Sequence, residues 1–346
     1  GHLYGIAPEF MLSSLVGRRD AIGDAEKWSL TEFLDFSDSL GEGEYLMEEV
    51  AQYNCESQYF SFLSYANFVR DGKAYYDSPE YIRRLEFMKS LPTEPRKYMD
   101  HGSNNLQDLY SGAITEEEVE VIAGGENLYH NGKIKLTNTY MQAPHHFTKA
   151  AYTFGADSPA DLNFIGYPVD DRCVSGIEVN VSYGLYAIPS CTKNAEVAWN
   201  FIESRMMADR YLEYAKNSAS GEISLSYFFK SYKPDYDKYL DAIEGYSIYY
   251  LHEGGSTGGW DFELDADGLY KNRPGTLYVI DRETIETIRH ILDTAGVPLW
   301  YSNVARTGIR QIVEEEESRY LSGNATAEST ADAIQSRVSI WLSEHE

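Results

Sequence analysis

Short apolar runs of strand type alternate along this chain with longer segments whose apolar residues recur every three or four positions. The clearest case lies between residues 159 and 206. An apolar run at 162–165 ends in a Gly-Tyr-Pro turn, and a second β-rich run covers 179–188. Asn194 then precedes a segment with apolar residues at 197, 198, 201 and 202. This pattern predicts strand, turn, strand and capped helix, which is an α/β unit.

Several other segments carry helix boundary signals. Ser29 and Glu32 have the spacing of a capping box, and Pro79 follows Ser78 at a first helical position. Both patterns predict helices that begin there. The remaining predicted helices cover 44–68, 147–154, 282–292, a segment that carries the apolar residues 309–320, and the stretch after 326.

Between these helices the pattern is less regular. An Asn-Gly turn predicts a strand over 133–141. Residues 225–250 are very rich in tyrosine, 254–260 read as a flexible glycine-rich loop, and 261–275 read as a polar insertion. The acidic run Glu314 to Glu317 is expected to be a solvated helix face.

Length and charge narrow the possible classes of protein. The 346 residues are enough for about two domains, and 43% hydrophobic residues support buried cores. A net charge of −26 repels phosphate backbones, so nucleic-acid binding is not expected.

The candidate metal ligands do not form a known pattern. Cys55, Cys173 and Cys191 lack metal-site spacing, and adjacent histidines at 145 and 146 do not share a helix face. An acidic stretch at 263–268 resembles the opening of a calcium loop, but its twelfth position is proline rather than glutamate. We therefore expect no metal and no cofactor.

Aromatic residues make up 14% of the chain and include 29 tyrosines. Tyrosine combines a flat apolar ring with a hydrogen-bonding hydroxyl. Such side chains suit sugar faces and also protein partners, so composition alone supports both.

The order of motifs resembles the extracellular solute-binding proteins of ABC importers, in particular the carbohydrate-binding branch of family 1 that includes maltodextrin-binding proteins. The matching pieces run nearly the whole length of the chain. They are Trp28-x-x-Thr31-Glu32-Phe33, Asp77-Ser78-Pro79-Glu80-Tyr81, Gly132-Lys133, Tyr186-Ala187-Ile188, Ala198-Trp199-x-Phe201-Ile202, Ile312-x-x-Glu315-Glu316, Tyr320-x-x-Gly323-x-x-Thr326 and Ile334-Gln335-x-Arg337.

The resemblance implies a two-lobe periplasmic-binding-protein fold of type II. Residues 1–19 would form a hinge crossing and 20–178 the second lobe, completed by 299–346. Residues 179–298 would return through the hinge and form the remaining part of the first lobe. Most of the first lobe would then be missing from this chain, and the surface left exposed would favour self-association.

The resemblance also implies ligand-binding residues. Glu9 ends a Tyr-x-Ile-Ala-x-Glu pattern that carries a ligand-contacting carboxylate in the maltodextrin-binding member. Tyr59, Tyr140 and the pair Trp300-Tyr301 resemble aromatic residues of the cleft. Trp260, in its glycine-rich loop, is a candidate lid residue. For each the alternative is structural: a solvated or ion-paired glutamate, a core aromatic, or an anchoring ring.

The function expected from this resemblance is capture of a carbohydrate, with an oligosaccharide as the expected ligand, for ABC permease subunits. The resemblance places such a protein outside the cytoplasmic membrane, in the periplasm or as a surface lipoprotein, and implies that it is not an enzyme. A glycan-active enzyme is one alternative, because acidic residues are plentiful and a pair of carboxylates can hydrolyse glycosides. A sensor or adhesion module of the same fold is the other.

Overall fold

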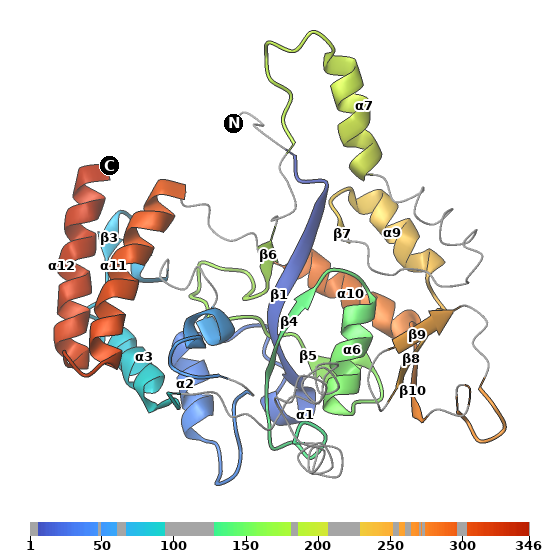
Figure 1. Ribbon diagram of the computed structural model, residues 1–346, viewed down its shortest axis with the longest axis horizontal. Coiled ribbons are helices and arrows are strands. Elements are labelled where there is room, and N and C mark those ends of the chain that lie inside the picture. Colours follow the sequence, from blue (N-terminus) through green and yellow to red (C-terminus); the bar gives the residue numbers. More distant parts are fainter. Residues whose placement is uncertain are drawn as a thin grey trace, which may run out of the picture.

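A computed structural model of the protein describes residues 6–47, 50–60, 67–93, 128–180, 186–206, 229–251, 256–259, 264–269, 271, 274–295 and 303–345. Strand β1 (Glu9–Arg18) crosses the middle of the molecule (Figure 1). The antiparallel strand β4 (Thr137–Met141) pairs with residues 12–16 of β1. Three short antiparallel strands pair at successive points along β1: β7 (Phe229–Lys230), β6 (Glu178–Asn180) and β5 (Leu162–Asn163). The α/β class predicted from the sequence is therefore confirmed.

Strand β1 separates two hydrophobic clusters. Its residues 11–17 are buried on both faces, and successive strand side chains point to opposite faces. Leu12 and Val16 accordingly join one cluster, and Leu15 joins the other. Helices α6, α9 and α10 lie on one side of β1, and α2, α3, α11 and α12 lie on the other (Figure 1).

The second cluster contains the N-terminal helices, and their local signals are confirmed. After α1 (Arg19–Ile22), α2 (Leu30–Asp38) begins at the predicted capping box, in which Ser29 and Glu32 bond reciprocally. Ser78 caps α3 (Pro79–Ser90). Between these helices lie the hairpin strands β2 (Val69–Arg70) and β3 (Lys73–Ala74).

The helix predicted over 44–68 is wrong in the part of that range that the structure describes. Tyr45 forms a bridge with Ile134, and turns follow. Among the described residues of this range, helical structure is limited to Cys55 with the π-helix η1 (Glu56–Phe60) and a short 3₁₀ turn at 67–68. The apolar residues Leu46, Val50 and Cys55 of this segment are nevertheless buried in the second cluster. Leu46 and Val50 are buried although they do not lie in a helix. Their apolar spacing reflects this burial, and for that reason it wrongly predicted a helix.

The first cluster contains the tyrosine-rich part of the chain. It is covered by α6 (His145–Phe154), η3 (Pro159–Asp161), α9 (Lys233–Ala242) and α10 (Arg282–Thr294). A second sheet has the order β10 (Gly275–Val279), β8 (Ser247–Leu251), β9 (Ser256–Gly259). Helix α7 (Ala195–Met206) follows the predicted Asn194 but extends away from the body of the molecule (Figure 1).

Strand β9 corrects the loop predicted over 254–260 in its described part. Residues 256–259 pair with β8 in an antiparallel register. At Gly258 a Cβ would lie 2.8 Å from the carbonyl oxygen of Ser247 and 2.9 Å from the ring of Tyr246. Glycine is thus required here for close strand approach rather than for loop flexibility.

The C-terminal helices α11 (Asn303–Leu321) and α12 (Ala327–His345) form a hairpin beside α3. The prediction that Glu314 to Glu317 is a solvated face is wrong for its second half, because Glu316 and Glu317 are each only 5% exposed. Glu316 pairs with Arg319 and Arg337. The prediction of solvent exposure is confirmed for Glu314, which is exposed and pairs with Arg310.

Glu317 belongs to a buried ionic cluster, defined here as Arg84, Glu317, Glu56 and Tyr81. Arg84 is 1% exposed, and its Nη1 donates to Oε1 of Glu317 at 2.8 Å. The hydroxyl of Tyr81 donates to the same oxygen at 2.8 Å, and Arg84 also pairs with Glu56. The cluster therefore joins α3 to α11 through the buried charges of Arg84 and Glu317 and reaches η1 through Glu56, whose side chain is 29% exposed.

No helix among the described residues is both long and apolar enough to cross a membrane. The proposed lobe boundaries at 19, 178 and 298 remain predictions.

Candidate functional site

Three of the predicted ligand-binding residues, Trp260, Trp300 and Tyr301, lie outside the described residues. Tyr59 lies in the second hydrophobic cluster and is 2% exposed. Its ring packs against Phe33 and Phe87, with ring centroids 5.6 and 5.5 Å away, and burial raises the pKa of its hydroxyl. The structure therefore places Tyr59 as a core aromatic, the alternative left open by the sequence.

Glu9 is the first residue of β1, and its side chain is 13% exposed. A carboxylate oxygen of Glu9 lies 3.5 Å from Nη2 of Arg205, in the last turn of α7. The pair connects the protruding helix to the central strand. Glu9 is therefore an ion-paired glutamate in this structure, and the Arg205 guanidinium offsets its negative charge.

Tyr140 has the most open position among the predicted residues that the structure describes. It lies on β4 directly opposite Ser13 of β1, and it is 41% exposed. On another edge of β1, Ser13 also lies directly opposite Glu178 of β6. Directly opposed residues point to the same face of a sheet. Tyr140, Ser13 and Glu178 consequently form a row across three strands.

Two further polar groups extend this row. Asn138 lies two residues from Tyr140 on β4 and so shares its face. Its Oδ1 accepts a hydrogen bond from the Tyr167 hydroxyl at 2.9 Å, and its Nδ2 donates to the carbonyl oxygen of Gln58 at 3.2 Å. Glu9 lies four residues before Ser13 on β1, so its side chain points to the same face as that of Ser13. We call the set the polar strip; it consists of Glu9, Ser13, Asn138, Tyr140, Tyr167 and Glu178.

The electrostatics of the polar strip agree with this proximity. Partial burial and, secondly, the Glu178 carboxylate raise the pKa of Tyr140. The pKa of Tyr167 is also raised, mainly by burial, with contributions from Tyr140 and Glu178. Both phenols are therefore neutral donors at physiological pH, beside a carboxylate that can only accept when ionised.

The chemistry available on the polar strip is recognition of a polar, flat-faced molecule. A half-exposed ring supplies an apolar surface, and amide, hydroxyl and carboxylate groups supply hydrogen bonds around it. Within the part of the chain that the structure describes, no three His, Cys, Asp or Glu side chains are placed to hold a metal ion.

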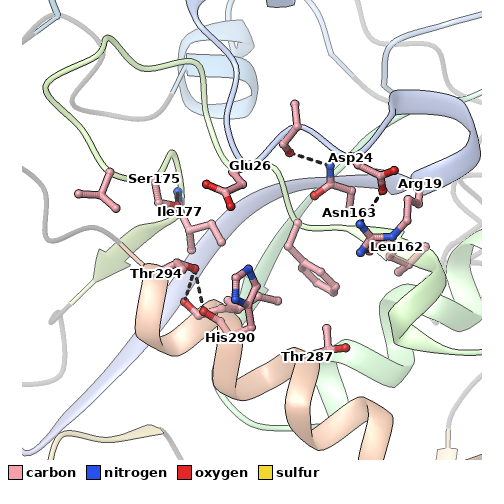
Figure 2. A pocket seen from close by; sticks show the side chains of 14 residues that line it. Arg19, Asp24, Glu26, Leu162, Asn163, Ser175, Ile177, Thr287, His290 and Thr294 are labelled. Atoms are coloured by element: carbon pink, nitrogen blue, oxygen red, sulfur yellow. Dashed lines mark hydrogen bonds and ion pairs between the residues drawn. The ribbon is translucent and has the colours of Figure 1, made fainter.

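A separate pocket of about 120 Å³ lies between α10, β5 and the segment that follows α1 (Figure 2). Glu26 and His290 point into it from opposite sides (Figure 2). Its other polar groups already bind the protein: Arg19 pairs with Asp24 at 2.8 Å, and Asn163 donates to two backbone carbonyls at 2.9 Å each. The sequence did not predict this pocket, and none of the predicted site residues lines it.

The sequence prediction included Glu9 and Tyr140 but missed the other four members of the polar strip, Ser13, Asn138, Tyr167 and Glu178. The alternation in β4 could have indicated Asn138, because it lies two positions before Tyr140 on a predicted strand. Glu178 adjoins another predicted strand, but its place opposite Ser13 depends on strand register. No local signal encodes that register.

No protein-family profile and no curated protein sequence matches the chain. Among solved structures it is similar to an extracellular solute-binding protein family 1 from Alicyclobacillus acidocaldarius, with 12% identity over 99% of this chain and 72% of that chain and a TM-score of 0.47. It is also similar to the sugar-binding protein MalE of Xanthomonas citri, with 12% identity over 99% of this chain and 71% of that chain and a TM-score of 0.48. A third similar structure is maltose-bound T. maritima MalE3, with 14% identity over 98% of this chain and 72% of that chain and a TM-score of 0.43. Similarities at this level do not place the chain in a family, so its function rests on the residues of the polar strip.

Proposed function

We propose that this protein is the substrate-binding component of an ABC importer and that it captures a carbohydrate, with an oligosaccharide as the expected ligand. The observation that carries this proposal is the row formed by Tyr140, Ser13 and Glu178 on one face of the central sheet. An aromatic ring that is 41% exposed can stack on the apolar face of a pyranose. The neighbouring carboxylate can accept hydrogen bonds from the sugar hydroxyls.

In the proposed mechanism the ligand binds the polar strip, contacts both lobes and stabilises their closed arrangement. Residues 1–19 and the return from 179 would act as the hinge. Glu9, paired with Arg205, would lie at the start of this crossing. The motif order of the sequence supports ABC permease subunits as partners and a location outside the cytoplasmic membrane, in the periplasm or on a lipid anchor.

The ion pair of Glu9 favours binding over glycoside hydrolysis. Glycosidases use two carboxyl groups about 5–10 Å apart, which must protonate the leaving group and attack the sugar or activate water. Glu9 and Glu178 are the two carboxylates of the polar strip, and a carboxylate oxygen of Glu9 already lies 3.5 Å from Nη2 of Arg205. A carboxylate paired with a guanidinium is a poor proton donor, because the opposite charge favours its ionised form.

The proposal is tested by thermal unfolding of the purified chain against a panel of mono- and oligosaccharides, followed by calorimetric titration of each ligand that stabilises it. A ligand at about 100 times its Kd should stabilise the fold by roughly 2.7 kcal/mol. Tyr140→Ala should weaken binding by about tenfold, equivalent to about 1.4 kcal/mol. Tyr53→Ala, which changes a tyrosine that is 70% exposed elsewhere, is the matched control.

Two results would contradict the proposal. One is a panel in which no saccharide raises the unfolding temperature. The other is a saccharide that binds the Tyr140→Ala variant as tightly as the unaltered chain, because the ring of the polar strip would then take no part. Hydrolysis of a chromogenic glycoside by the purified chain would instead support the enzyme alternative.

A further inference from the structure

The polar strip carries a carboxylate next to its stacking ring, and this arrangement restricts which saccharides can bind. We propose that Glu178 makes the strip selective for uncharged saccharides or polyols and that it rejects sugars carrying a carboxylate, such as uronic acids. The inference rests on the proposed carbohydrate-binding function and specifies the substrate class of that same site.

The position of Glu178 is set by the register of β6 on β1. Because Glu178 and Tyr140 both lie opposite Ser13, their side chains point to the same face and are separated by one strand. Neighbouring strands are about 4.8 Å apart, so the two residues lie about 10 Å apart across the sheet. A pyranose ring stacked on Tyr140 would therefore bring its substituents within reach of the Glu178 side chain.

The other members of the strip near Ser13 are uncharged. Asn138 carries an amide, and Tyr167 carries a hydroxyl whose pKa is raised, mainly by burial. An ionised carboxylate accepts hydrogen bonds from hydroxyls more strongly than a neutral acceptor does. It repels a second carboxylate, and at a partly buried position water screens that repulsion only in part. The net charge of −26 acts in the same direction.

The electrostatic influence of Glu178 on its neighbours supports this geometry. Burial is the main cause of the raised pKa of Tyr140, and the Glu178 carboxylate is the second. The same carboxylate contributes to the raised pKa of Tyr167. A charge that acts on the hydroxyl of the exposed Tyr140 will also act on a ligand stacked on its ring.

The test uses the full chain with defined probes. Neutral probes are maltotriose, xylotriose, glucose, galactose and mannitol; acidic probes are trigalacturonate, glucuronate and galacturonate. Titration calorimetry at pH 7.5 should show that glucose binds at least about tenfold more tightly than glucuronate, and galactose at least about tenfold more tightly than galacturonate. Maltotriose and xylotriose should exceed trigalacturonate by a similar factor. Raising the salt concentration should narrow this ratio, because salt screens the repulsion.

Glu178→Gln separates the charge from the shape of the side chain. We expect the variant to lose about tenfold in affinity for the neutral sugar, as a charged acceptor becomes neutral. We also expect its discrimination against the acidic sugar to fall by a similar factor. Glu344→Gln, which removes one exposed carboxylate near the end of α12, is the matched control and should change neither value.

The outcomes distinguish this inference from the function on which it rests. If neutral sugars bind, Tyr140→Ala weakens them, and Glu178→Gln leaves both affinities unchanged, then the charge inference is overturned and the carbohydrate function stands. Equal binding of neutral and acidic sugars by the unaltered chain overturns it as well. If no sugar of either class binds, the proposed function is overturned together with the inference.

Discussion

Replacing Arg84 with methionine is expected to lower the free energy of unfolding by about 3–5 kcal/mol at pH 7.5, the usual cost of removing one partner from a buried ion pair. Arg84 is 1% exposed, and the Glu317 side chain that accepts from it is 7% exposed. Methionine fills a similar volume but donates no hydrogen bond. Glu317 would keep only the Tyr81 hydroxyl from the buried ionic cluster.

The same variant should show a characteristic dependence on pH. Burial raises the pKa of Glu317 above its ordinary value of 4.5, and the Arg84 charge opposes that rise. Removing Arg84 should therefore raise the pKa of Glu317 further. A carboxyl group whose folded-state pKa is raised contributes stability below its unfolded pKa, and this stability is lost as the pH rises through the folded pKa. The deficit of the variant should thus be largest at neutral pH and should shrink toward pH 4.5.

Urea unfolding followed by circular dichroism at pH 7.5 and pH 5 measures both effects. The matched control is Arg83→Met on the same helix, because Arg83 pairs with Asp35 and Asp38 at the surface and such pairs contribute about 0–1 kcal/mol. Replacing Arg84 and Glu317 together with apolar residues should recover part of the loss. The reasoning is refuted if Arg84→Met lowers the free energy of unfolding at pH 7.5 by no more than Arg83→Met does.

Two further predictions concern the backbone and the thiols. Gly166→Ala should destabilise the fold by roughly 3 kcal/mol or more, because φ is +76° and a Cβ would lie 2.1 Å from the carbonyl carbon of Gly176. The control Gly43→Ala, at φ +80° with no described atom within 4 Å of the added Cβ, should cost only about 1 kcal/mol. Equal losses of stability for the two variants in urea unfolding would contradict the argument. Cys191 is exposed and should react with a disulfide reagent at pH 8, whereas burial raises the pKa of Cys55 to about 12 and should protect it until urea unfolds the chain. Fast labelling of Cys55 in the native state would contradict its buried position.

Local signals in the sequence predicted those features that depend on a few adjacent residues. The capping box at Ser29 and Glu32 and the Ser78-Pro79 helix start both appear in the structure. In each case the bonded groups lie within three residues of one another, so the pattern contains nearly all of the interaction. The apolar spacing that predicted a helix over 282–292 was also local, and α10 confirms it.

Sequence patterns did not decide the surroundings of residues whose contacts come from distant segments of the chain. Tyr59 could belong to a cleft or to a core, and its contacts with Phe33 and Phe87 place it in the core. Glu317 looks solvated in an acidic run, yet Arg84, which is 233 residues away, neutralises and buries it. Burial of a charge depends on its partner, and no local pattern reveals a partner at that separation.

The sequence by itself determined the acidic and tyrosine-rich character of the chain and most of the alternation of strands and helices. Through its resemblance to solute-binding proteins it also predicted Glu9 and Tyr140 as ligand-binding residues, and this remains a prediction. Only the tertiary structure brought Tyr140 beside Glu178, because both are positioned by pairing with Ser13 on β1. Strand register sets which residues are opposed, and a shift of one residue would turn each side chain to the other face of the sheet. Register is decided by packing across the whole sheet, and for that reason the site exists only in the folded chain.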